Sequence, residues 1–190
     1  MSLPFIETVK GMITDPGETI RRSRSASLGD AIIYYLIILG IFSLLSAAVT
    51  RLLGDAHPMP LSPAGDIALA ATYLVGIIIG GTIALLIIGA ILHICIKIFG
   101  GSGDYTDTVR AFSLAETPAA AIGWIPLIGL FAGIWGFILM VMGVSEYHGI
   151  STLRAVIAIL LPFILLIILA VLAFMFFMVV PGPVTVTEVF

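Results

Sequence analysis

The sequence predicts an all-α polytopic membrane protein: a bundle of five transmembrane helices preceded by an amphipathic helix at the membrane interface. Of the 190 residues, 61% are hydrophobic and only 10% are charged, whereas an average soluble domain carries about 25% charged residues. Mean hydropathy is +1.25, and long uncharged apolar runs alternate with short polar loops. This composition excludes a soluble globular enzyme, because it cannot cover a water-exposed surface.

Residues 1–26 are expected to form a cytoplasmic segment with two short helices. Apolar residues recur at helical spacing over residues 3–13. This stretch is too short and too charged to span a bilayer, so we expect it to lie in the interface plane. Asp15 and Pro16 then predict a second helix, because Asp caps helix N-termini and Pro suits the first helical position.

Three arginines, Arg21, Arg22 and Arg24, close this segment just before the first apolar run. A basic residue beside an anionic leaflet contributes about 1 kcal/mol of binding. The cluster is therefore a candidate contact for anionic lipid. The simpler interpretation is an orientation signal for the first span, and one feature can serve both purposes.

Residues 27–180 are expected to form the membrane domain, and residues 181–190 a short extracytoplasmic tail. The five spans are predicted at residues 28–53, 66–99, 105–122, 126–145 and 151–180. Ser27 with Asp30 forms a capping-box pattern before the first span, and Pro162 predicts a kink in the fifth. The third span is the weakest, since it holds three charged residues and a proline.

The basic residues predict the orientation. With five spans and a cytoplasmic N-terminus, seven of the eight Lys and Arg residues lie on or near the cytoplasmic side, and only Arg51 lies outside. If the third span were instead a re-entrant hairpin, Arg154 would move outside and the ratio would become six to two. The two alternatives differ in the side of the C-terminus, which five spans place outside the cell.

The third span carries an acid, Glu116. A charge at the bilayer centre costs about 2.5–3.5 kcal/mol on insertion scales, so such a residue faces the bundle interior and is a candidate for function. The candidate polar site comprises Glu116, Ser113, His93, Lys97 and Thr82. The structural alternative is that the acid caps the backbone gap left by Pro118, or hydrogen-bonds a neighbouring helix.

Small residues form stripes on two spans. The fourth span carries Gly129, Gly133, Gly136 and Gly143, and the second carries Gly76 and Gly80. Helices in lipid associate through close backbone approach, so these glycines are candidate packing residues. The stripe on the fourth span predicts either packing within one bundle or a dimer seam.

Several kinds of site lack support in the sequence. The single cysteine, Cys95, excludes an intramolecular disulfide, and the three histidines are expected to lie far apart, so no metal site is predicted. Residues 101–104 match the GxGD motif of intramembrane aspartyl proteases, but the second intramembrane Asp is missing. We interpret the motif as a flexible turn with an Asp cap. No catalytic residue, cofactor or nucleic-acid-binding face is predicted.

The glycine-rich loop at residues 100–108, Pro118, and the run from Pro126 to Pro162 with Trp135 and the turn at residues 148–155 together resemble the Yip1 domain family. The resemblance implies five spans with a cytosolic N-terminus. Eukaryotic members act in vesicle traffic and bind Rab-type GTPases. This chain lacks their long N-terminal region and their Asp-Leu-Tyr-Gly-Pro motif, so it resembles prokaryotic members, archaeal ones included, and GTPase binding is not carried over.

We therefore expect a non-enzymatic, multi-pass protein of the cell membrane. The leading hypothesis is a membrane-organising scaffold or adaptor of Yip1 type. Its expected partners are membrane lipids, a second copy of the chain or another membrane protein. The alternative is a small transporter or channel component with a polar path between the second and third spans.

Overall fold

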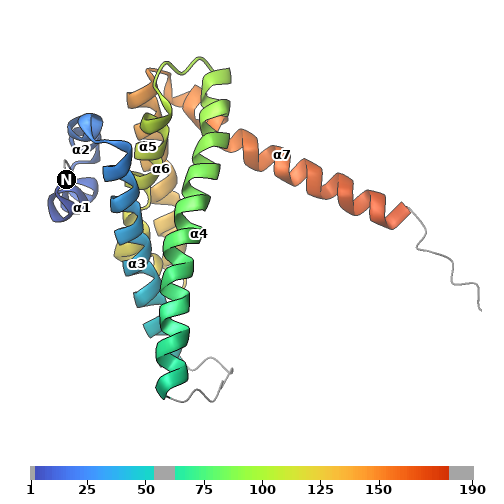
Figure 1. Ribbon diagram of the computed structural model, residues 1–190. Helices are drawn as coiled ribbons and strands as arrows, with labels where there is room; N and C mark the ends of the chain where they lie inside the picture. Colours follow the sequence, from blue (N-terminus) through green and yellow to red (C-terminus); the bar gives the residue numbers. More distant parts are fainter. Residues whose placement is uncertain (1–2, 54–62, 180–190) are drawn as a thin grey trace, which may run out of the picture.

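The computed structural model describes residues 3–53 and 63–179, with side chains for residues 3–49 and 75–176. Within these ranges all elements are helical (Figure 1). In chain order they are α1 (Phe5–Thr14), α2 (Pro16–Arg22), the 3-10 turn η1 (Ser23–Ser25), α3 (Leu28–Leu53), α4 (Pro63–Ile98), α5 (Tyr105–Ala115), the π-helical turn η2 (Ala119–Gly123), α6 (Gly129–His148) and α7 (Thr152–Val179). The tail at residues 181–190 lies outside the described residues.

Two predicted helix starts are confirmed by their caps. The Asp15 carboxylate accepts a hydrogen bond from the Glu18 backbone N–H at 3.1 Å, with Pro16 at the first helical position. At the start of α3, the Asp30 N–H donates to the Ser27 hydroxyl at 3.1 Å, and that hydroxyl donates to the Asp30 carboxylate at 2.9 Å. Both caps satisfy backbone donors that a helix N-terminus leaves free.

Four helices in the described part of the chain are long and apolar enough to cross a membrane. These segments are Leu28–Val49, Val75–Ile98, Gly129–His148 and Thr152–Phe176. They correspond to the first, second, fourth and fifth predicted spans.

The predicted third span, residues 105–122, is divided into two pieces. α5 ends at Ala115, and a π-helical turn follows from Ala119. The break has a covalent cause, because Pro118 lacks the N–H that would bond the carbonyl of Leu114 in a continuing helix. The Thr117 hydroxyl donates to that carbonyl instead, at 2.6 Å.

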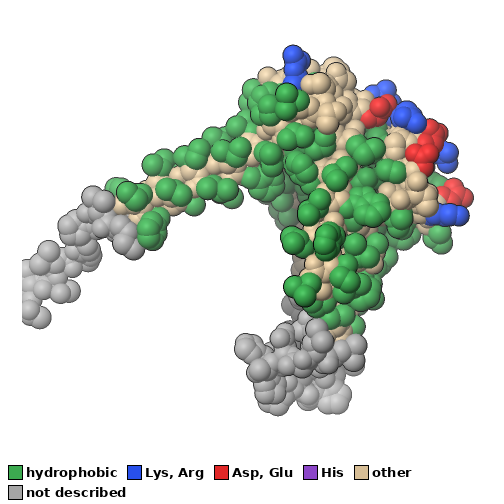
Figure 2. Space-filling model, turned by 180° about the vertical axis from the view of Figure 1, so that it is seen from behind, with side chains coloured by type: hydrophobic (Ala, Val, Ile, Leu, Met, Phe, Trp, Pro, Cys, Tyr) green, Lys and Arg blue, Asp and Glu red, His purple; other side chains and the backbone are tan. Residues whose placement is uncertain are grey.

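α5 is nevertheless the innermost helix of the bundle. It packs against α3, α4 and α6, and all but one of the residues from Thr108 to Ala115 are buried. Polar residues of this segment face inward, since Arg110 and Ser113 of α5 and Thr117 just after it are all buried. α3, α4 and α6 pack around it, and the longer helices turn apolar side chains outward, as the hydrophobic surface in Figure 2 shows.

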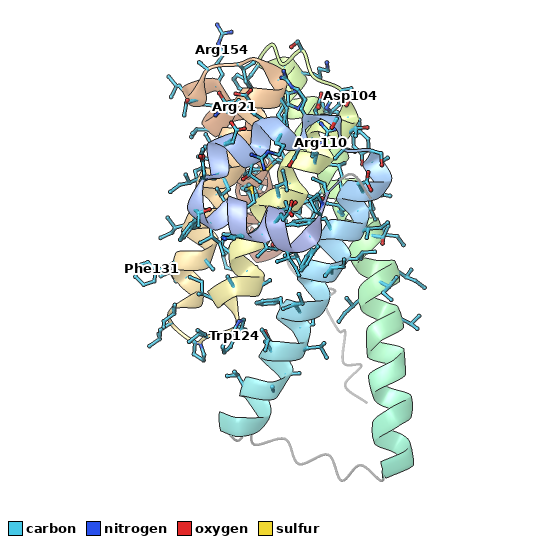
Figure 3. All side chains as sticks on the ribbon, turned by 90° about the vertical axis from the view of Figure 1, so that its left-hand side faces the viewer. Arg21, Asp104, Arg110, Trp124, Phe131 and Arg154 are labelled. Atoms are coloured by element: carbon cyan, nitrogen blue, oxygen red, sulfur yellow. The ribbon has the colours of Figure 1, made fainter. Side chains whose placement is uncertain are left out.

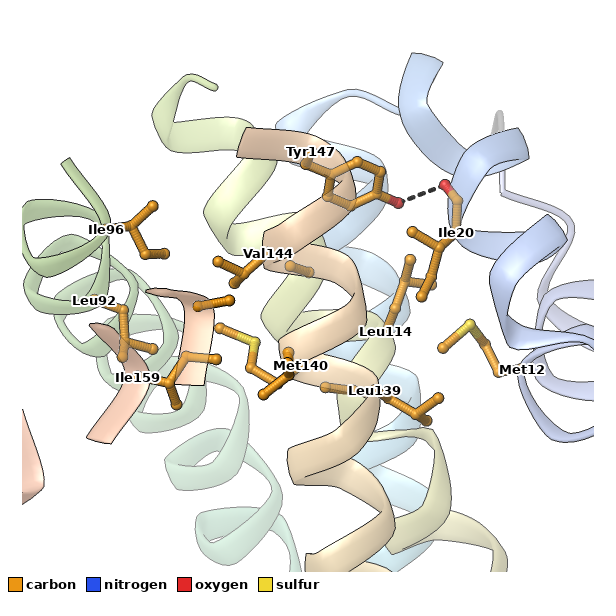
Figure 4. Packing of buried hydrophobic residues seen from close by; sticks show 14 of the residues in the cluster. Met12, Ile20, Leu92, Ile96, Leu114, Leu139, Met140, Val144, Tyr147 and Ile159 are labelled. Carbon is orange, nitrogen blue, oxygen red and sulfur yellow. Dashed lines mark hydrogen bonds between the residues drawn. The ribbon is translucent and has the colours of Figure 1, made fainter. Parts of the chain in front are cut away.

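The two N-terminal helices pack on the side of the bundle. Met12 of α1 and Ile20 of α2 are buried in the same cluster as Leu114 and Leu139 (Figure 4). On the other side of α1, Ile6 is 79% exposed. α1 therefore has apolar side chains on two sides, one packed against the protein and one facing away from it. Its position in the membrane interface stays a prediction.

α7 leaves the bundle after its first turns (Figure 1). Ala155, Ala158 and Ile159 belong to the core, whereas the side chains beyond Pro162 are exposed on all faces of the helix. α7 continues as one helix through Pro162, and its packing against the neighbouring helices ends near this residue; the predicted kink there stays a prediction.

Candidate functional site

Charged side chains gather at one end of the molecule. In Figure 2 the acidic and basic side chains cluster where α1 and α2 pack and around the adjoining turns. Arg21, Asp104, Arg110 and Arg154 lie toward this end in Figure 3, and Trp124 lies away from it. We call it the charged end.

The predicted lipid-contact arginines are exposed but partly paired. The Arg21 and Arg22 guanidinium groups lie 3.0 Å and 3.6 Å from the carboxylate of Glu18. Arg24 donates a 2.7 Å hydrogen bond to the backbone carbonyl of Glu146, at the end of α6. Two of the three charges thus share one acid, so the attraction of the cluster for an anionic surface is weaker than three free arginines would give.

A buried arginine attaches the N-terminal segment to α5. Arg110 forms a 2.6 Å ion pair with Asp107, and it also donates to the backbone carbonyl of Ala26. Its guanidinium carbon lies 5.2 Å from the centre of the Tyr147 ring. The Tyr147 hydroxyl in turn donates to the Ile20 carbonyl at 2.7 Å (Figure 4).

The glycine-rich loop at residues 100–104 packs against the end of α6. Ser102 donates to the His148 carbonyl through its backbone N–H at 2.9 Å and through its hydroxyl at 3.0 Å. A Cβ on Gly103 would lie 2.8 Å from the Tyr147 carbonyl oxygen, so a larger residue does not fit. The loop ends in a complete capping box, in which the Asp107 N–H donates to Asp104 at 2.9 Å and the Asp104 N–H donates to Asp107 at 3.0 Å. The predicted Asp cap is confirmed, and the loop is fastened to α6.

Two histidines that were expected to lie far apart lie close together. The Thr108 hydroxyl is 2.8 Å from Nδ1 of His93 and 3.0 Å from Nε2 of His148. The expectation that these two histidines lie far apart is wrong, because the loop after α4 packs against the end of α6 and both residues reach Thr108. His57 lies outside the described residues, and within them no group of three potential metal ligands is found.

Glu116 lies at the end of α5 and lines a cavity of about 350 Å³ between α3, α4, α5, α6 and α7. The cavity walls are otherwise apolar, with Phe42, Phe112, Phe137 and Phe163 among them. Within the described residues the carboxyl group makes no hydrogen bond and no ion pair. The gap at Pro118 is filled by Thr117, as described above, and not by Glu116.

The other members of the candidate polar site lie elsewhere. His93 contacts Thr108, and Lys97 donates to the Ser102 carbonyl at 3.3 Å, both near the charged end. Thr82 and Ser113 each donate to the carbonyl four residues earlier in their own helix. None of the four lines the cavity that Glu116 lines. The structure therefore does not assemble the five residues into one site.

The glycines divide into two groups. A Cβ on Gly136 would lie 2.9 Å from the Ala115 carbonyl, and one on Gly143 would lie 3.0 Å from the Ala111 side chain, so these positions allow α6 to approach α5 closely. Gly129 similarly abuts the carbonyl of Gly123. Around Gly133, Gly76 and Gly80, by contrast, a Cβ would meet nothing within 4 Å.

Sequence reasoning did not identify Arg110, Tyr147 and Thr108 as the residues that hold the charged end together. For Arg110 a signal was present, because Asp107 precedes it at the i, i+3 spacing of a helical ion pair. For Tyr147 and Thr108 no local pattern was available, since their partners lie 127 and 40 residues away in the sequence.

In the part of the chain that the structure describes, the fold is that of a polytopic helical membrane protein whose charged side chains gather at one end. The Yip1 domain matches residues 10–175, which is most of the chain. The protein therefore belongs to the Yip1 domain family. No curated protein and no solved structure matches the chain.

Proposed function

We propose that this protein is a non-enzymatic membrane scaffold of Yip1 type, whose charged end recruits lipid or protein partners to the cytoplasmic face of the cell membrane. The observation that carries the proposal is the charged end itself, a defined surface on an otherwise apolar bundle. Arg110 and Tyr147 hold the N-terminal helices in place there, so a partner would meet a preformed surface.

The proposal includes five membrane crossings. The α5–η2 segment runs antiparallel to α6, and α3, α4, α6 and α7 are the other four crossings. The N-terminus then lies in the cytoplasm and the C-terminus outside. The positive charges of the charged end support this orientation, because Arg and Lys favour the cytoplasmic side.

The alternative function is a small transporter with a polar path between the second and third spans. That path would need Glu116, His93 and Lys97 along one route. Glu116 lines an apolar cavity, and the other two contact the loop and α5 near the charged end. This separation favours the scaffold.

Vesicle recruitment tests the proposal. The full-length protein in nanodiscs of neutral lipid is mixed with vesicles that contain phosphatidylglycerol, and binding is followed by flotation. We expect binding that weakens when Arg21 and Arg22 are both changed to Gln, and that falls with added salt. The matched control is Arg154→Gln, which removes one positive charge from the first turn of α7 at the same end of the molecule. Binding that is equal for neutral and anionic vesicles would contradict lipid recruitment, and ion or proton flux in liposomes would favour the transporter.

A further inference from the structure

The cavity at Glu116 has the form of a small-molecule site. Its volume of about 350 Å³ lies within the range of such pockets, roughly 300–1,000 Å³. Leu92, Met140 and Ile159, which lie together in Figure 4, are buried core residues that also line it. On the α6 side the wall includes Gly129, Gly133 and Gly136, which have no side chain, and Gly133 is exposed. The cavity is therefore bounded by the core and accessible beside α6.

The cavity contains one acid and no counter-charge. The acid, Glu116, has no ion pair among the described residues, and the other wall residues carry no charge. A carboxylate in an apolar environment is costly unless a cation or a proton neutralises it. An apolar pocket with a single polar group is also the usual arrangement for fixing the orientation of a bound molecule.

Four phenylalanine rings also favour a positively charged ligand. Phe42, Phe112, Phe137 and Phe163 line the cavity from four different helices. The face of an aromatic ring attracts cations, and quaternary ammonium groups are recognised in this way. The carboxyl group and the rings thus favour the same ligand, one that is apolar in bulk and positively charged.

We propose that this cavity binds a lipophilic cation, an amine or onium group on an apolar body, with the Glu116 carboxylate as its counter-ion. This site is independent of the charged end and of the scaffold function.

The test uses tetraphenylphosphonium as the probe and tetraphenylborate, an anion of the same shape, as its control. Binding of both to the purified full-length protein in a non-ionic detergent is measured by equilibrium dialysis. We expect tetraphenylphosphonium to bind at least tenfold more tightly than tetraphenylborate. Glu116→Gln should weaken binding of the cation at least tenfold.

A pair of glycine variants locates the binding site. Gly133→Leu adds a bulky side chain at the cavity wall, at a position where a Cβ meets nothing within 4 Å, and it should abolish binding. Gly80→Leu is the matched control, since its surroundings are equally open and it does not line the cavity. It should leave binding unchanged. Folding of each variant is verified by size-exclusion chromatography and the fluorescence of Trp124 and Trp135.

Three results would overturn the proposal. Equal binding of cation and anion would show that the cavity takes apolar molecules regardless of charge. Unchanged cation binding in Glu116→Gln would remove the carboxyl group from the site. A change of oligomeric state in Gly133→Leu, without a change in cation binding, would assign this face to a second copy of the chain.

Discussion

At the scale of single residues, Arg110 shows how this bundle tolerates a buried charge. Its side chain is almost fully inaccessible, yet its donors reach a carboxylate and a backbone carbonyl, and its planar group lies over an aromatic ring. A buried charge is stable only when it is paired and hydrogen-bonded in this way. The planar guanidinium group suits this set of partners better than an ammonium group would.

Replacing Arg110 should destabilise the protein strongly. Arg110→Ala leaves Asp107 without its cation and Ala26 without its donor, so we expect a loss of about 3–5 kcal/mol. Arg110→Lys should recover only part of this loss. Unfolding in mixed micelles measures the effect, with Arg154→Ala as a control that changes an exposed arginine. Equal stabilities of the two alanine variants would contradict the structural role of Arg110.

Gly103→Ala should also be destabilising, by about 1–3 kcal/mol, because the added methyl group would overlap the Tyr147 carbonyl and force the loop away from α6. Gly133→Ala provides the contrast. It adds a methyl group in open space within a helix, so it should stabilise the protein by up to about 1 kcal/mol. Thermal unfolding of the two variants in detergent measures both. Changes of the same sign in the unfolding temperatures of the two variants would contradict this difference between the two glycines.

Residue-level features were predictable where they depend on local spacing. Asp15, Ser27 with Asp30, and Asp104 cap helices as predicted, since a cap involves only the next three residues. The contact between His93 and His148 was not predictable in this way, because it depends on how a loop folds against a distant helix.

At the scale of elements, α5 is the most deeply buried helix, although it belongs to the least apolar of the predicted spans. Hydropathy identified α3, α4, α6 and α7, because lipid-facing helices must be apolar on their outer faces. It could not show that α5 lies at the centre, since a helix surrounded by protein can carry polar side chains that bond one another. The break at Pro118 was visible in the sequence, but the Thr117 hydroxyl that fills the gap was not anticipated.

The attachment of α1 and α2 can be tested at this scale. Tyr147→Phe removes the hydrogen bond to the Ile20 carbonyl and should cost about 1 kcal/mol. We expect faster amide hydrogen exchange in residues 15–25 as the helices separate more often from the bundle. Tyr105→Phe is the matched control, since it loses a bond of the same length to Leu86 elsewhere. Exchange in residues 15–25 that is the same in both variants would contradict the role of Tyr147.

At the scale of the whole molecule, the number of crossings depends on the α5–α6 hairpin. Its turn places Leu127 outward, with 91% of that side chain exposed, while the loop before α5 adjoins the charged end. If the hairpin crosses the membrane fully, Leu127 lies outside the cell. If the hairpin is re-entrant, Leu127 does not reach the outer side of the membrane.

Cysteine labelling of intact cells distinguishes these arrangements. Starting from Cys95→Ala, which removes the buried native thiol, single cysteines are introduced as Ser102→Cys and Leu127→Cys. With five crossings, a membrane-impermeant maleimide should label position 127 in intact cells and position 102 only after permeabilisation. A reporter at the C-terminus should be extracytoplasmic. Protection of position 127, together with a cytoplasmic reporter, would contradict five crossings.

The enclosed position of α5 also has a consequence for biosynthesis. A segment that carries Asp107, Arg110 and Glu116 partitions poorly into lipid on its own, because each charge adds several kcal/mol to the cost of insertion. Thr108 bonds His148 of α6, Arg110 bonds the segment before α3, and Thr117, just after α5, bonds Tyr34 of α3. If α5 crosses the membrane, we therefore expect it to insert only after α6 has been synthesised, when these partners are present.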